Sequence, residues 1–299
     1  MAGSISSRLA ATLLAVAVCC SAVGADSSSP AEGASAATGT ALVRAVLPRM
    51  LLLVVVAGVL AGIVMAWRGR VLPSRDIAGL LAFEEAVARA TEMGRPTLFT
   101  TGGGSEMKRV QLFASMPLLR EVARLSGQFG NRLIVPCCYP ETMPVHINAM
   151  RDGYLDAGAI DAFRTEDVRF FPGGLFFFAM GSMGWMLEER PAACFYFGYW
   201  VADALLFAET GQTVQAMQIA GTDQLAQIPF FITSCDYTII GEEFWAASAK
   251  LSQDPPLLGS LGAQDVFKLS VLLVIVAGCA LCAFETVARF FAELKGAFA

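Results

Sequence analysis

Strand-like apolar segments alternate with amphipathic, helix-like segments from residue 74 onward, and this alternation constrains the fold more than any other feature. The strand-like segments are PTLFTTGGG, RLIVPCC, DVRFF, ACFYFGY, AMQIAG and YTIIGEE. Between them lie helix-like segments such as DIAGLLAFEEAVARATEMG, whose apolar residues recur every three or four positions before Gly94. Strands alternating with helices are typical of a parallel sheet covered on both faces. The sequence therefore predicts an open, doubly wound, Rossmann-like α/β domain with a mainly parallel sheet of about six or seven strands.

Two of the helix-like segments have unusual features. Pro117 lies inside EMKRVQLFASMPLLREVARLSGQFG and is expected to start, kink or divide that helix. The segment 170–187, FFPGGLFFFAMGSMGWML, has no charge, but its Pro-Gly-Gly leaves only about 13 residues of helix, too short to cross a bilayer. A helix that is apolar on every side still needs cover, which predicts a subunit interface or packing near the membrane.

Two apolar runs, without charge over 50–67 and 269–284, flank this region, and the overall composition agrees with a membrane protein. Apolar residues make up 56% of the 299 residues and charged residues only 16%. The runs 50–67 (MLLLVVVAGVLAGIVMAW) and 269–286 are close to the roughly 20 residues that a membrane-spanning helix needs. They predict two transmembrane helices around an α/β domain at 70–268, with a short C-terminal tail at 287–299.

The N-terminal segment predicts targeting to a membrane. LAATLLAVAVCCSAVGA follows Arg8 and ends in small residues, which indicates a signal peptide at 1–25, or else an uncleaved signal anchor. The Ser/Ala/Gly-rich stretch 26–48 then reads as a flexible extracytoplasmic tether. Arg68, Arg70 and Arg75 crowd the exit of the first long run, which favours a cytoplasmic location for the α/β domain. The sequence thus predicts a multi-pass protein of the inner (cytoplasmic) membrane.

Charge, cysteine and histidine content exclude several functions. Residues 68–268 contain 16 Lys and Arg against 22 Asp and Glu, so nucleic acid is not an expected partner. Cys137, Cys138, Cys194 and Cys235 have no metal-ligand spacing and are expected to be reduced and buried. His146 is the only histidine and is expected to be a surface or packing residue. No metal and no cofactor is predicted.

Ligands of open parallel sheets bind beyond the carboxyl ends of the strands, so the candidate residues are those that follow each strand. Thr101, Gly102, Gly103 and Gly104 form a glycine turn that would suit an anion, although they lack both the P-loop lysine and the GxGxxG spacing. The alternative is a plain turn.

A second candidate group surrounds the next strand ends. Gly221, Thr222 and Asp223 fit either a ligand contact or the cap of a following helix. Glu242 or Glu243 could approach Asp223 as a carboxylate pair, or they could be solvated carboxylates at a helix start. Asp223, Glu242 and Glu243 are the only catalytic candidates that the sequence offers.

Several long strings of the sequence resemble those of a known protein family. ATEMGRPTLFTTGGG, ERPAACFYFGYWVADALLFAETGQ, QIAGTDQLAQIPFFITSCDYTIIGEEFWAASAKLS and PPLLGSLGAQDVFKL resemble a bacterial family of membrane-anchored α/β proteins known as a domain of unknown function. The resemblance covers about residues 70–268 and the flanking runs. It implies flanking transmembrane helices and a cytoplasmic α/β domain, and it carries no activity, ligand or catalytic residue. Members usually have PGIG or a similar string where this chain has TTGGG.

These observations predict a membrane-anchored cytoplasmic binding or scaffolding module that associates with itself or with other proteins of a membrane complex. The alternative is an enzyme that acts on a small anionic or nucleotide-like substrate at the strand ends. The absence of a recognised nucleophile-base pair, metal spacing or nucleotide fingerprint favours the first.

Overall fold

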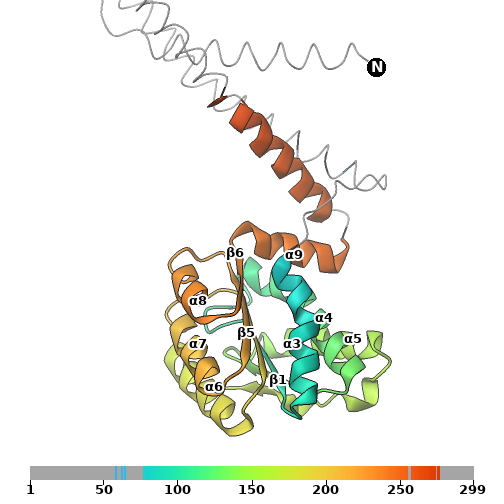
Figure 1. Ribbon diagram of the computed structural model, residues 1–299, viewed down its shortest axis with the longest axis vertical. Helices are drawn as coiled ribbons and strands as arrows, with labels where there is room; N and C mark the ends of the chain where they lie inside the picture. Colours follow the sequence, from blue (N-terminus) through green and yellow to red (C-terminus); the bar gives the residue numbers. More distant parts are fainter. Residues whose placement is uncertain are drawn as a thin grey trace, which may run out of the picture. The chain divides into compact units, whose positions relative to one another are not determined.

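The computed structural model describes residues 58, 62, 64, 77–254, 257–273 and 275–276. Between 77 and 254 the chain alternates helices and strands, as the sequence predicts (Figure 1). The helices are α3 (Ala78–Glu92), α4 (Val110–Phe129), α5 (Met143–Asp156), α6 (Leu175–Glu189), α7 (Ala204–Thr213), α8 (Ile228–Ser234) and α9 (Glu242–Ser252). The strands are β1 (Thr97–Thr100), β2 (Leu133–Cys137), β3 (Val168–Phe170), β4 (Ala193–Phe197), β5 (Met217–Thr222) and β6 (Tyr237–Ile240). Two short 3-10 helices, Ile160–Ala162 and Thr165–Asp167, precede β3.

The strands form one six-stranded sheet in the order β3-β2-β1-β4-β5-β6, and every pairing is parallel. This confirms the predicted parallel α/β sheet. The central strands are buried along their whole length, whereas the edge strands β3 and β6 are partly exposed. The chain moves outward from β1 to β3 and then returns to β4, so the strand order reverses between β1 and β4. Ligands of doubly wound proteins bind at such a reversal, beyond the carboxyl ends of the two strands.

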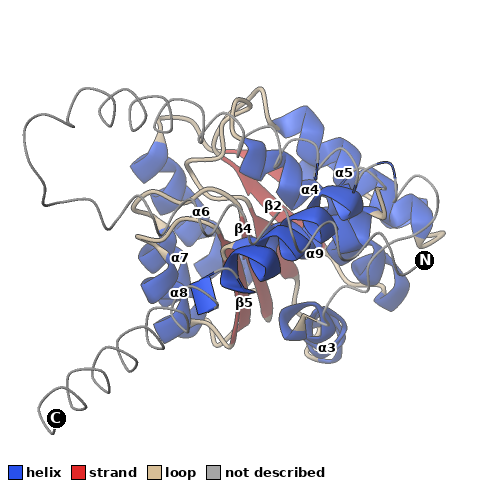
Figure 2. Ribbon diagram, turned by 90° about the horizontal axis from the view of Figure 1, so that it is seen from above, coloured by secondary structure: helices blue, strands red, loops and turns tan. Residues whose placement is uncertain are grey.

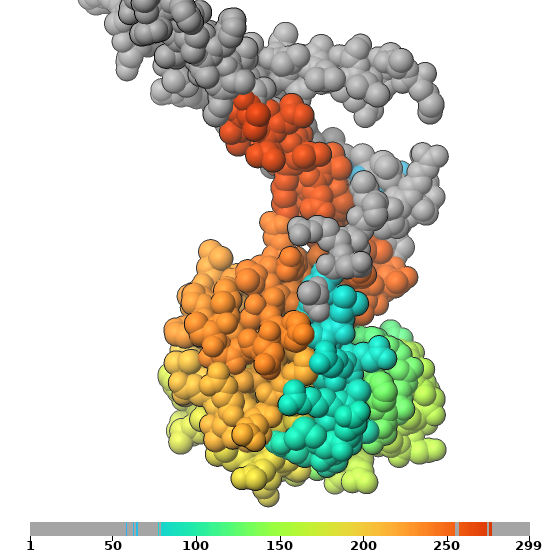
Figure 3. All heavy atoms as spheres, viewed as in Figure 1, coloured from blue at the N-terminus to red at the C-terminus, as the bar shows by residue number. Residues whose placement is uncertain are grey.

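Helices cover both faces of the sheet (Figure 2), and each face has its own apolar core. Successive side chains of a strand point to opposite faces. Phe99 of β1 accordingly packs with α3, α4, α5 and α9, whereas the preceding Leu98 packs with α6, α7 and α8. Figure 3 shows the turquoise band of α3 between the orange residues of α8 and β6 and the green residues of α4 and α5. Burial on both faces explains why the strands read as nearly continuous apolar runs.

Pro117 does not divide its helix, because α4 continues from Val110 to Phe129 around it. A proline removes one backbone donor from a helix, but tertiary packing can offset that loss. Leu118, Leu119 and Val122, which follow it, are fully buried in the core of this face. The expectation of a start or a division at Pro117 was therefore wrong.

Both segments that join the domain to the rest of the chain leave it at the carboxyl edge of the sheet. Helix α3 ends in a turn that enters β1, so α3 itself begins at the carboxyl edge. Helix α9 follows β6 and lies across the strand ends (Figures 1 and 2). Its Phe244 is fully buried and stacks on Phe197, the last residue of β4, with ring centroids 6.3 Å apart. The entry and the exit of the domain are therefore on one side.

The sheet and its helices form a compact unit, Pro73–Asp254. Beyond it, residues 257–273 are helical, and Gly62 packs closely against this helix. A Cβ added to Gly62 would lie 2.6 Å from the carbonyl oxygen of Gly259 and 2.7 Å from the Cβ of Ala263.

Among the described residues, no helix has the length and apolar character needed to cross a membrane. The predicted signal peptide (1–25), the tether (26–48) and the C-terminal tail (287–299) lie outside the described residues. So do most of the run 50–67 and residues 277–286 of the second run, while residues 269–273 and 275–276 are helical.

Candidate functional site

The loop after β1, residues 101–109, occupies the reversal point of the sheet. Its first part, from Thr101 to Ser105, is completely buried. Gly102 has a φ of +79°, a left-handed conformation that favours glycine. The three glycines at 102–104 thus let the backbone turn sharply against the neighbouring loop after β4.

The glycines are needed because the loop after β4 fills the space beside them. A Cβ added to Gly102 would lie 2.8 Å from the ring of Trp200, and one added to Gly104 would lie 2.5 Å from the ring of Tyr199. Trp200 is buried, with its ring packed edge-on against Phe207 and Phe231. Side chains of this domain therefore occupy the position where a doubly wound protein would receive its ligand.

Asp203 takes the place of an anionic ligand. It directly precedes α7, is buried, and accepts a hydrogen bond of 2.6 Å from the backbone N–H of Gly103 and one of 3.2 Å from that of Val201. Burial raises the pKa of Asp203, and its backbone hydrogen bonds act in the opposite direction. The predicted anion-binding N–H of the glycine turn is thus already bonded to a carboxylate of the same chain.

Ser105 fastens the two loops together. Its hydroxyl donates to the carbonyl oxygen of Thr101 at 2.5 Å and accepts from the backbone N–H of Tyr199 at 2.9 Å. Gly198 lies so close to Thr101 that an added Cβ would be 2.1 Å from its carbonyl oxygen. Tyr199 also contacts Arg109, whose guanidinium lies 4.2 Å from the centroid of the tyrosine ring. The reversal point is therefore covered as well as filled.

His146 supports the same loop from α5. Its Nδ1 lies 2.8 Å from the carbonyl oxygen of Thr142, which can only accept, so Nδ1 carries the proton. The hydroxyl of Thr101 then donates to Nε2 at 3.2 Å. Burial lowers the pKa of His146 to about 4. His146 is thus a buried packing residue and not a surface residue, and its partner Thr101 comes from a loop 45 positions earlier.

The end of β5 does not cap a helix. Thr222 is the last residue of the strand; its hydroxyl donates to the carbonyl oxygen of Gly198 at 3.0 Å and accepts from the backbone N–H of Gln224. Helix α8 begins only at Ile228, and no side chain caps it. The expectation that Thr222 or Asp223 caps the following helix was therefore wrong. Gly221 is also buried in the strand, where an added Cβ would lie 2.5 Å from the ring of Phe197.

Asp223 accepts hydrogen bonds from two side-chain amides. The side-chain amides of Gln111 and Gln224 donate to its two carboxylate oxygens, both at 2.9 Å. Glu242 and Glu243 are exposed in the first turn of α9, where the helix dipole favours negative charge. The strand ends do meet, since the N–H of Gly241 donates to the carbonyl oxygen of Thr222. Asp223 is partly exposed and is held by these two glutamine side chains.

The cysteines of the described region are free thiols. Cys137 belongs to the core on one face of the sheet and Cys138 to the core on the other, as expected for adjacent strand residues. Burial raises the pKa of both thiols, that of Cys138 to about 11. In the part of the chain that is described, no cluster of His, Cys, Asp and Glu could hold a metal ion.

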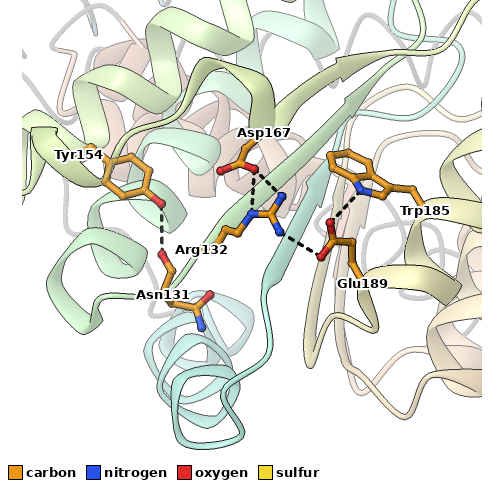
Figure 4. A network of polar contacts seen from close by, with 6 residues as sticks. All are labelled: Asn131, Arg132, Tyr154, Asp167, Trp185 and Glu189. Carbon is orange, nitrogen blue, oxygen red and sulfur yellow. Dashed lines mark hydrogen bonds and ion pairs between the residues drawn. The ribbon is translucent and has the colours of Figure 1, made fainter.

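A charged cluster at the opposite, amino edge is also structural (Figure 4). Arg132, just before β2, forms ion pairs with Asp167 at 2.7 Å and with Glu189 at 3.0 Å. The indole N–H of Trp185 donates to the second oxygen of Glu189. These bonds join the start of the sheet to the end of α6.

Sequence reasoning missed Asp203, Trp200, Ser105 and Gln111. Asp203 had one signal, as the only charge in ACFYFGYWVADALLFA. A lone carboxylate in an apolar segment indicates a buried partner, but its partner Gly103 lies 100 positions away. Trp200, Ser105 and Gln111 carry no local signal.

These features define the class of the protein as a doubly wound α/β domain whose reversal point is closed by its own side chains. Residues 40–293 match the family described as "Domain of unknown function (DUF6754)". The chain therefore belongs to this family. The comparisons with curated proteins and with solved structures gave no match.

Proposed function

We propose that this protein is a binding or scaffolding module of the inner membrane, with its α/β domain on the cytoplasmic side. It presents surfaces to proteins, including copies of itself, and does not turn over a small substrate at the strand ends.

The closed reversal point is the observation that carries this proposal. The N–H of Gly103 is bonded to Asp203, and the adjacent volume contains Trp200, which is only 1% exposed. A nucleotide or phosphate would have to displace both the carboxylate and the ring. Asp223, one of the three predicted catalytic candidates, has both of its oxygens bonded to glutamine amides.

Membrane anchoring is supported by the two ends of the domain. They leave it at the same edge, and the sequence on either side contains the apolar runs 50–67 and 269–286.

The test is ligand retention by the full-length protein, purified gently from membranes. Native mass spectrometry is expected to show the protein without a stoichiometric small molecule. A ligand that binds only the folded state raises the melting temperature. Because none of them is expected to bind, added NAD, ATP or inorganic phosphate should leave the melting temperature unchanged.

An enzyme of small anionic substrates predicts the opposite result. A molecule would copurify, and Asp223→Asn would release it while the exposed control Glu209→Ala would not. That result would overturn the proposal.

A further inference from the structure

We draw no further inference here: the strongest candidate, the apolar outer face of helix α6 with its exposed Phe176, Met180 and Leu187, carries none, because nothing in the part of the chain that the structure describes shows what covers it.

Discussion

Asp203 shows how one buried carboxylate can replace a ligand. Backbone N–H groups of Gly103 and Val201 bind it, and burial opposes its charge, which raises its pKa. Such a group is retained only when its hydrogen bonds repay the cost of removing it from water. The loop after β1 and the start of α7 are held together by this balance.

Replacing Asp203 with alanine is expected to destabilise the domain. The buried N–H of Gly103 loses its acceptor, and a buried unpaired donor costs about 1–3 kcal/mol. Urea unfolding followed by tryptophan fluorescence should show this decrease in the free energy of unfolding. Glu209→Ala, at an exposed position on α7, should stay within about 0.5 kcal/mol of the original chain. Equal stability of the two variants would show that water reaches Gly103 and that the reversal point is open.

His146 predicts a specific loss of stability in acid. Its pKa is lowered from 6.5 to about 4 in the folded domain, so the unfolded chain takes up a proton first as the pH falls. Its contribution is complete above pH 6.5 and is lost as the pH falls toward 4, by up to roughly 3 kcal/mol at 1.36 kcal/mol per pKa unit.

His146→Asn keeps a donor for Thr142 and removes the titration. The free energy of unfolding is measured against pH for the original chain and for His146→Asn. Both chains contain Asp203, so its contribution cancels in the difference between the two curves, and the slope that belongs to His146 remains. Parallel profiles would contradict the assignment.

At the scale of elements, the glycine turn after β1 is expected to tolerate no side chain. Gly102 and Gly158 both have positive φ, +79° and +69°, but only Gly102 faces a packed neighbour, the ring of Trp200. Gly158→Ala should cost about 1–2 kcal/mol through backbone strain alone. Gly102→Ala should cost at least about 1 kcal/mol more, because overpacking adds to the strain. Thermal melting of both variants measures the difference, and equal costs would mean that Trp200 can move aside.

The elements themselves could be read from the sequence, and the reason is burial. Strands such as LFT and FYF are apolar throughout because helices cover both faces. The start of α8 could not be predicted from the sequence. A threonine hydroxyl can accept a hydrogen bond from the backbone N–H two residues later both at a helix cap and in a turn, so the residue types do not distinguish the two. Thr222 makes that bond with Gln224 four residues before α8 begins. Local patterns thus predicted which segments form elements, but not what their ends contact.

At the scale of the whole molecule, the strand order and the closed reversal point depend on contacts between distant segments. Gly103 meets Asp203 and Gln111 meets Asp223 only after the chain has crossed the sheet. Their residue types are ordinary in helix starts and turns, and the one local signal, the lone charge of Asp203 in an apolar segment, does not identify its partner. The candidate residues Thr101 to Gly104 and Gly221 to Asp223 were correctly located at one edge, because parallel strands bring their carboxyl ends together. What fills that edge became visible only in three dimensions.

The common exit edge leads to a prediction for the orientation of the chain in the membrane. If both flanking runs cross it, the domain lies on one side, while the tether 26–48 and the tail 287–299 lie on the other. Labelling of intact cells with a membrane-impermeant maleimide should therefore reach Ser28→Cys and Ala297→Cys but not Leu81→Cys, although Leu81 is 73% exposed.

In permeabilised cells the maleimide should label all three variants, which controls for the accessibility of each position. Native Cys137, Cys138 and Cys194 are buried but Cys235 is only partly buried, so the unaltered chain is labelled in parallel to measure the background. Labelling of Leu81→Cys in intact cells would put the domain outside and contradict the orientation that Arg68, Arg70 and Arg75 predict.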